Sequence, residues 1–296
     1  MSVEGNVFVF FSMSAKNIIN VALVYDFDGT LSPGNMQEFG FVQAIGKDTD
    51  DFWNRTYEMA ASNDASSILC YMYQMLQEAK ANHISLKRKD FQKFGSMVEL
   101  YKGVEEWFDL INRYGESKGL NIHHYINSSG LKEMIEGTRI AQEFDNIYAC
   151  SFMYDANGNA YWPAVAVDYT AKTQFLFKIN KGIHEVSDNK KINEYVAKED
   201  RYIPFERMIY FGDGETDVPS MSVVKSQGGH SIAVYGNQRK EDTAMRLAKE
   251  NRVDFICKAD YSEGEEIHTV IRHILDKIRT DYDLRQLIAA NKDKDN

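Results

Sequence analysis

Cysteine and positive charge are both scarce in this sequence, and each shortage narrows the class of protein. Its three cysteines, Cys70, Cys150 and Cys257, lie far apart and form no C-x-x-C pair, so neither a disulfide framework nor a zinc site is indicated. A cytoplasmic location is expected. The 296 residues carry 34 Lys and Arg against 44 Asp and Glu, a net charge of -10. Such a charge repels a phosphate backbone, so no nucleic-acid partner is expected.

Long apolar runs are also missing, which argues against a membrane partner. The N-terminal segment 7–11 is apolar but short, and it follows Glu4 without any basic residue before it. A signal peptide would have a basic start and a longer apolar stretch. We expect residues 1–20 to form a disordered leader, or an extension upstream of a true start at Met13.

Short apolar runs rich in β-branched residues alternate with segments of helical periodicity. The first run, residues 21–27, ends in two acids and a glycine, which is typical of a buried parallel strand entering a loop. Further strands are expected at 122–126, 208–211, 231–235 and 253–257, and helices at 132–142, 188–199, 241–250 and 264–278. This alternation predicts an α/β fold: a three-layer, Rossmann-like, doubly wound parallel sheet, whose ligands bind at the carboxyl ends of the strands.

The segment between the first two strands has apolar residues at helical spacing and no strand pattern. Residues 33–115 are therefore expected to form a helical cap domain, inserted into a core made of 21–32 and 116–296. Residues 147–167 have a turn-rich centre between aromatic runs, which predicts a β-hairpin. The sequence shows no internal repeat and does not indicate an oligomeric state.

The first chemical signal is the run from Asp26 to Leu31, where the first strand meets its loop. Side chains alternate along a strand, so Asp26 and Asp28 point the same way while Phe27 faces the core. Two adjacent carboxylates can serve as a nucleophile and a general acid/base. An Asx turn that only ends the strand is the structural alternative.

Two further signals are typical of anion binding. Ser128, Ser129 and Gly130 follow the second strand, where a helix is expected to begin near Leu131, and its free N–H groups could hold a phosphate. The same residues are also an ordinary helix cap. Lys172 opens a later helix, against the helix dipole, so it needs a partner such as a phosphate or a carboxylate. Lys181 lies farther along that helix, and a solvated surface lysine is the alternative for Lys172.

The fourth signal is acidic: Asp213 and Asp217 lie in a glycine-containing loop after another strand. Mg²⁺ prefers a few hard oxygen ligands from protein, with water and substrate completing its octahedron. Asp213 together with the first-strand acids would supply them. A calcium-like loop or a plain turn remains open from this motif alone.

In this order the four sites resemble the four motifs of the haloacid dehalogenase superfamily of phosphohydrolases. The layout is most similar to the phosphoserine-phosphatase-like branch, which has a helical cap between the first and second motifs and a hairpin before the lysine. The resemblance covers nearly the whole chain from about Val21 onward. It implies a phosphatase that uses Mg²⁺ and an aspartyl-phosphate. It assigns Asp26 as nucleophile, Asp28 as acid/base, Thr30, Ser128, Ser129, Gly130 and Lys172 as phosphate-binding residues, Asp26, Asp28 (through its carbonyl) and Asp213 as metal ligands, and Asp217 as a supporting acid.

One departure concerns the substrate. Phosphoserine phosphatases carry a glutamate after the first motif that helps to recognise the substrate's amino group, and Asn35 stands there. Glu38 could replace it only if the cap begins differently. We therefore expect a small phosphomonoester other than phosphoserine.

Alternative functions remain open from the sequence. A phosphomutase shares the aspartyl-phosphate but returns the phosphoryl group to a sugar, and a binding or regulatory protein could retain the fold without turnover. A nucleic-acid end phosphatase would have to use the basic run 87–89, a pattern more typical of a solvated helix face. His123 and His124 are expected to be one buried and one edge side chain rather than metal ligands.

Overall fold

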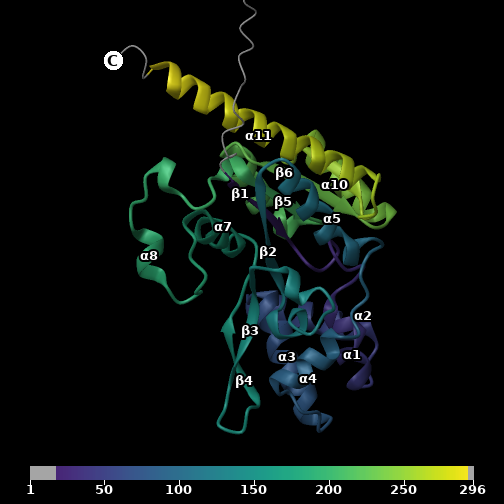
Figure 1. Cartoon of the computed structure of the whole chain (residues 1–296). Helices are drawn as coiled ribbons and strands as arrows, with labels where there is room; N and C mark the ends of the chain where they lie inside the picture. The colour runs from purple at the N-terminus through teal and green to yellow at the C-terminus, as the bar shows by residue number, and fades with distance from the viewer. Residues whose placement is uncertain (1–17, 293–296) are drawn as a thin grey trace, which may run out of the picture.

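A computed structural model describes residues 18–292, and its centre is a seven-stranded sheet in the order β4-β3-β2-β1-β5-β6-β7 (Figure 1). Every neighbouring pair is parallel except β3 and β4, which form an antiparallel hairpin at one edge. The expected α/β sheet is confirmed. The strands are β1 Ile19–Tyr25, β2 Leu120–Leu131, β3 Asn146–Tyr154, β4 Ala160–Val165, β5 Met208–Gly212, β6 His230–Tyr235 and β7 Phe255–Lys258.

The strand β1 sits at the centre of the sheet, between β2 and β5. Its residues Val21 to Tyr25 are fully buried, as the continuous apolar run requires. Tyr25 pairs with Ile126 of β2 and with Phe211 of β5, and the Asp26 N–H donates to the Phe211 carbonyl at 2.8 Å. This register brings the residues after all three strands to one edge of the sheet.

Helices cover both faces of the sheet. The helices α5 Val104–Ser117 and α11 Glu266–Lys292 pack against each other, and α7 Ala171–Lys181 packs against α9 Val218–Ser226. Each crossover between parallel strands is right-handed. Helices whose connections run one way along the sheet therefore lie on one face, and helices whose connections run the other way lie on the opposite face. A further helix, α10 Gln238–Lys249, packs on β6 and β7. Among residues 18–292, no helix combines the length and apolarity needed to cross a membrane.

A chain of buried hydrogen bonds ties α5 to the end of β1. The Trp107 indole donates to the Tyr25 hydroxyl at 2.9 Å, which in turn lies 3.1 Å from His124 Nδ1. The other ring nitrogen of His124 lies 3.0 Å from Asn112 Oδ1. Neutral His124 with its proton on Nε2 satisfies every partner in this chain. Tyr25, the residue before Asp26, is thereby held by hydrogen bonds to both α5 and β2.

This packing changes the expected cap boundary. Residues 33–115 were expected to form the cap, yet α5 lies on the sheet beside β2, because Trp107, Phe108 and Ile111 are fully buried there. We therefore place α5 with the core, so that the proposed cap ends before Val104. At the other end of the core, Ile19 and Asn20 belong to β1 and not to a leader. The apolar segment 7–11 lies outside the described residues.

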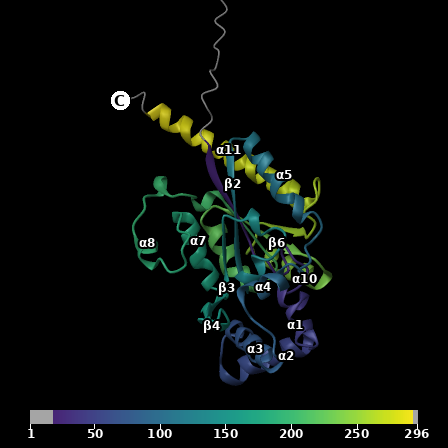
Figure 2. The same ribbon diagram turned by 60° about the horizontal axis from the view of Figure 1, so that its bottom comes forward.

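Helices make up the cap, which lies at the end of the molecule opposite α11 (Figure 1, Figure 2). The helix α2 begins after Asp48, whose carboxylate accepts from the Asp50 and Asp51 N–H groups. The helices α2 and α3 pack against each other, and the Gln74 side-chain amide of α3 donates to the Phe52 carbonyl of α2 at 3.0 Å. The cap elements are the 3₁₀ helix η1 Met36–Phe39, α1 Phe41–Ala44, α2 Thr49–Asn63, α3 Ser67–Ala81 and α4 Arg88–Gly95.

The expected hairpin is present as β3 and β4, and it extends alongside the cap (Figure 1). The Ala160 N–H donates to the Leu86 carbonyl at 2.9 Å, and α3 packs on β4. The cap is therefore joined to the core through the hairpin as well as through its two chain connections.

Three helices differ in length from the expectation. Residues 132–142 form only α6 Lys132–Ile135 and η2 Ala141–Glu143, because the Thr138 hydroxyl bonds the Ile135 carbonyl and ends the helix. Residues 188–199 form only α8 Asn189–Asn193 and η3 Lys198–Asp200. The helix α11 continues past residue 278 to Lys292, with ion pairs Lys277–Asp281 and Arg279–Asp283 at helical spacing.

Candidate active site

Asp26 and Asp28 follow β1, and the loop that carries them is shaped by Gly29. Asp26 is 5% exposed, and its Oδ1 accepts from the Phe27 N–H at 2.7 Å. Gly29 has φ of +76°, and a side chain there would strike the Asp213 carboxylate. Only glycine lets the first acidic loop approach Asp213 this closely.

Lys172 lies beneath Asp26 and is fully buried. Its ammonium lies 3.1 Å from Asp26 Oδ2 and 2.6 Å from Asp217 Oδ1, and Asp217 Oδ1 also accepts from the Tyr210 hydroxyl at 2.8 Å. Burial by itself would lower the pKa of Lys172, but the carboxylates of Asp217 and Asp26 outweigh it and raise that pKa. Lys172 is therefore a permanent cation next to Asp26. The partner that the helix-opening lysine needed is a pair of carboxylates.

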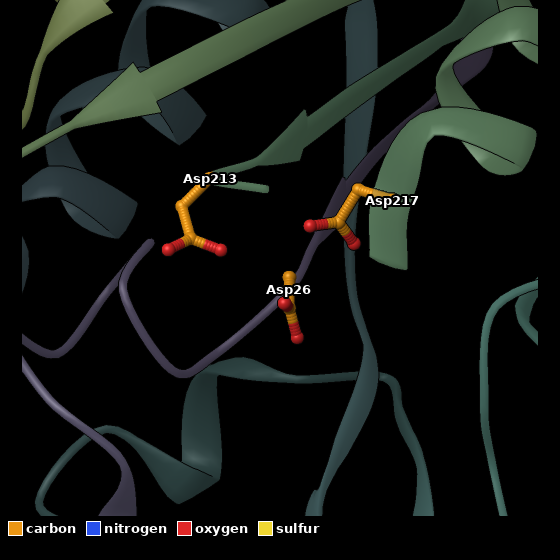
Figure 3. A group of neighbouring side chains, drawn as sticks. All are labelled: Asp26, Asp213 and Asp217. Carbon is orange, nitrogen blue, oxygen red and sulfur yellow. The ribbon is translucent and has the colours of Figure 1, made fainter. Parts of the chain in front are cut away.

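Acids from two distant parts of the chain meet at this edge of the sheet. Asp213 follows β5 and Asp217 ends the 3₁₀ helix η5 Glu215–Asp217 before α9, so that both lie beside Asp26 (Figure 3). One oxygen from each of Asp26, Asp213 and Asp217 lies within 4.8 Å of the others. The Asp217 Oδ2 atom is buried without a hydrogen-bond partner among residues 18–292.

The charge at this cluster favours a divalent cation. Lys240 of α10 lies 2.5 Å from Asp213 Oδ2, so the ammonium groups of Lys172 and Lys240 face the three carboxylates of Asp26, Asp213 and Asp217. With all three carboxylates ionised, one negative charge is uncompensated. Mg²⁺ would compensate it, and the all-oxygen donor set fits its preference. Asp28 is not in this cluster through its carboxylate, which instead accepts from the Met36 N–H at 2.9 Å.

Burial also changes the pKa of Asp28. Desolvation, with the charge of Asp26 next, raises the pKa of the Asp28 carboxyl well above its usual range. A carboxyl that holds its proton near neutral pH can donate it to a leaving group. Asp26 differs in its contacts, since the Lys172 ammonium lies 3.1 Å from its Oδ2. The two acids of the first motif thus occupy different environments.

The second motif lies at an irregularity in β2. The register of the pairing between β2 and β3 shifts between Asn127 and Leu131. Within this irregular segment the Gly130 N–H donates to the Ser128 hydroxyl at 3.1 Å. A side chain at Gly130 would collide with Met36 and approach Asp28 Oδ2. The helix expected after this motif is only the four-residue α6, so the segment 128–130 itself, rather than a helix end, borders the site.

A cavity of about 290 Å³ lies between the cap and these core residues. On the core side it is lined by acids, hydroxyls and a cation: Asp26, Asp28, Ser128, Ser129, Gly130, Asp213, Thr216 and Lys240, with Tyr169. Polar residues of the cap, Asn35, Gln37 and Ser67, line it from above, as do the apolar and aromatic side chains of Trp53, Tyr57, Ile68 and Tyr71. The cap and the core thus enclose one pocket around the acids.

Not every residue expected at the site reaches this cavity. Thr30 is fully buried outside its lining, and its carbonyl accepts from the Tyr261 hydroxyl at 2.8 Å. Lys172 and Asp217 lie behind Asp26 and contact it or its neighbours rather than the open space. His123 and His124 are both buried, and His123 Nδ1 lies 2.9 Å from Asp145.

Sequence reasoning missed Lys240, Thr216, Tyr210 and the cap side chains. Lys240 lies in the first turn of α10, just after β6 ends at Tyr235. The position of Lys240 just after a predicted strand could have identified it, because every loop at the carboxyl ends of a parallel sheet borders the same crevice. The cap residues carried no such signal, since an aromatic on a helix reads first as core.

Glu38 does not take the place of the missing glutamate. Its Oε1 accepts from the Asn35 amide at 2.6 Å and from the Trp53 indole at 2.8 Å. Asn35 itself lines the cavity, while Glu38 lies behind it. The cap therefore presents an amide and an indole at this position, and no free carboxylate.

Comparisons with known proteins agree with this arrangement. The sequence matches the haloacid dehalogenase-like hydrolase family over residues 23–222. An uncharacterized protein of Borreliella burgdorferi is 31% identical over 283 aligned positions, which cover 86% of this chain and 96% of that protein.

Solved structures show the same fold at low sequence identity. A substrate-bound phosphoserine phosphatase superposes with a TM-score of 0.53 at 14% identity, covering 86% of this chain and 98% of its own. A protein of unknown function from Bordetella pertussis superposes with a TM-score of 0.51 at 14% identity, covering 81% and 99%.

Proposed function

The chain belongs to the haloacid dehalogenase-like hydrolase family, and from this membership and its site we propose that it is a Mg²⁺-dependent phosphatase of small phosphorylated metabolites, acting through an aspartyl-phosphate on Asp26. One observation carries the proposal: the Asp26 carboxylate borders the cavity, with a buried ammonium 3.1 Å away and a second acid two residues later. A nucleophile and a proton donor therefore border one space, with a cation directly behind the nucleophile.

Electrostatics explains why these groups must occur together. Bringing a carboxylate within about 4 Å of a phosphate dianion costs about 8 kcal/mol at an effective dielectric near 20. Lys172 offsets part of this repulsion from behind Asp26. Mg²⁺, held by the Asp26 and Asp213 carboxylates and the Asp28 backbone carbonyl, would neutralise the transferring oxygens.

The remaining residues handle orientation and protons. Asp26 attacks the phosphorus, and Asp28 protonates the leaving alkoxide and then deprotonates the water that releases phosphate. Ser128 and the N–H groups of Ser129 and Gly130 orient the phosphoryl oxygens. Asp217 and Tyr210 hold Lys172 in place, and the cap excludes bulk water.

The test is phosphate release from acetyl phosphate in Mg²⁺, with Asp26→Asn as the principal variant. The amide is nearly isosteric with the carboxylate but is a poor nucleophile, so we expect turnover to fall at least a thousandfold with the fold intact. Asp109→Asn, an exposed position on α5, is the matched control and should retain wild-type rates.

A chemical trap separates the covalent mechanism from other hydrolysis. Borohydride reduces an acyl phosphate, so rapidly quenched wild-type enzyme should show a reduced residue at position 26 by peptide mass spectrometry. Near-wild-type phosphate release by Asp26→Asn would reject Asp26 as nucleophile. Transfer of the phosphoryl group to a sugar, without phosphate release, would identify a phosphomutase instead.

A further inference from the structure

We propose that the cavity selects a neutral leaving group that carries a flat ring and hydroxyl groups, such as a nucleoside or a cyclic sugar. This substrate class rests on the proposed phosphatase function, because it concerns the part of the substrate that the phosphoryl group leaves. Among residues 18–292, every cap residue that lines the cavity is uncharged, whereas the charged lining residues all belong to the core.

The absence of charge on the cap side has a direct consequence for amino-acid substrates. An ammonium or carboxylate on the leaving group would lose its water under the cap, where no charged cap side chain among residues 18–292 lines the cavity to pair with it. The Glu38 carboxylate lies outside the lining, and its Oε1 already accepts from Asn35 and Trp53. A neutral leaving group has no such cost.

A buried amide indicates that the leaving group donates hydrogen bonds. Gln37 is 1% exposed and lines the cavity, yet its Oε1 has no hydrogen-bond partner among residues 18–292. A buried carbonyl without a partner is costly, so a ligand that donates an O–H or N–H to it gains affinity. The neighbouring Met36 N–H binds Asp28, which holds Gln37 close to the proton donor and hence to the leaving oxygen.

An aromatic wall indicates that the leaving group has a flat face. The Trp53 ring lies 6.3 Å from Tyr57 in a stacked arrangement and 6.0 Å from Tyr71 in an edge arrangement. The Tyr71 hydroxyl donates to the Ser129 carbonyl at 2.8 Å, which connects the wall to the second motif. Tyr57 lines the cavity but remains 56% exposed, so part of its ring is free to stack on a ligand.

The size of the cavity limits the ligand. Its volume of about 290 Å³ lies just below the range of roughly 300–1,000 Å³ for ligand pockets. A single nucleoside or monosaccharide fits this scale.

The first test compares kcat/KM across phosphomonoesters with acetyl phosphate as the reference that lacks a large leaving group. The panel contains a nucleoside 5′-monophosphate, a cyclic hexose phosphate, neutral acyclic glycerol 3-phosphate, zwitterionic phosphoserine and anionic 3-phosphoglycerate. We expect at least one of the two ring substrates to exceed all three acyclic ones by tenfold or more. A preference for phosphoserine or 3-phosphoglycerate would contradict the requirement for a neutral leaving group. Equal kcat/KM values for the ring substrates and glycerol 3-phosphate would contradict the requirement for a ring.

The second test uses variants of the cavity wall. Tyr57→Ala and Gln37→Leu should each lower the ratio of kcat/KM for the preferred ring substrate to that for acetyl phosphate, by about tenfold. Tyr73→Ala removes an equally exposed cap tyrosine outside the cavity and should leave this ratio unchanged. An unchanged ratio in both cavity variants would overturn the proposal.

Failure of the proposed function has a different signature, namely no hydrolysis of acetyl phosphate or any other substrate by the wild type. In that case, calorimetric binding of the same panel to the full chain in Mg²⁺ still tests the cavity. Tighter binding of the ring phosphates than of phosphoserine supports the selection, and the reverse order contradicts it.

Discussion

At the scale of single residues, two lysines of α7 illustrate how position decides a role. Lys172 is fully buried and bound to two carboxylates. Lys181, at the other end of the helix, donates to the Ile192 carbonyl at 2.6 Å and to the Glu194 carbonyl at 2.5 Å. One lysine serves the acidic cluster, and the other caps the end of α8.

We predict that Lys172→Ala loses far more activity than Lys181→Ala. Loss of a cation beside the transferring group should raise the barrier by about 2–4 kcal/mol, comparable to the loss of an oxyanion donor. The measurement is kcat with acetyl phosphate in saturating Mg²⁺, with circular dichroism to verify the fold. Equal losses of activity in the two variants would show that Lys172 has no special role in the active site.

At the scale of secondary-structure elements, the buried chain from Trp107 through Tyr25 and His124 to Asn112 joins α5, β1 and β2. Burial lowers the pKa of His124 to about 3, because a charged imidazole would lose its water there. The folded state therefore keeps His124 neutral, whereas the unfolded chain takes up a proton below about pH 6.5. The stability that depends on neutral His124 is present above pH 6.5 and is lost as pH falls toward 3.

The predicted consequence is a pH-dependent free energy of unfolding. Between pH 7 and pH 5 the protonation of unfolded His124 should cost about 2 kcal/mol. In urea titrations, the free energy of unfolding should fall from pH 7 to pH 5 in the wild type by about this amount more than it falls in His124→Gln. His273→Gln, at an exposed position of α11, should behave as the wild type. A His124→Gln protein with the wild-type pH slope would contradict the assignment.

At the scale of the whole molecule, the sheet collects acids that are almost 190 positions apart in the chain. Asp26 follows β1 and Asp213 follows β5, yet these strands are neighbours and run in the same direction. The carboxylates they bring together repel one another in the folded state, while they are far apart in the unfolded chain. Stability and cation binding are therefore linked.

Mg²⁺ should accordingly stabilise the fold as well as support turnover. A ligand at 100 times its Kd stabilises by about 2.7 kcal/mol, so Mg²⁺ should raise the melting temperature by several degrees. Excess EDTA should silence the enzyme until Mg²⁺ is restored. Asp213→Asn should lose the thermal response, whereas Glu215→Gln, whose exposed side chain pairs with Arg246, should keep it. Full activity in excess EDTA would exclude the metal.

The sequence by itself determined the sheet, the hairpin and the positions of the four motifs. Each of these depends on local chemistry, because an apolar β-branched run predicts a buried strand and the residues after parallel strands meet at one edge. Family membership followed from the same motifs and is confirmed. The roles of Asp26, Asp28 and Lys172 remain predictions that the experiments above test.

Only the tertiary structure decided which side chains complete the site. Lys240 reaches Asp213, Glu38 is bound by Asn35 and Trp53, and the Gln37 Oε1 atom has no hydrogen-bond partner among residues 18–292. The assignment of α5 to the sheet also depends on the hydrogen bond from Trp107 to Tyr25 of β1. Such outcomes depend on contacts between segments far apart in the chain, and the periodicity of a helix shows that a face is buried without showing what covers it.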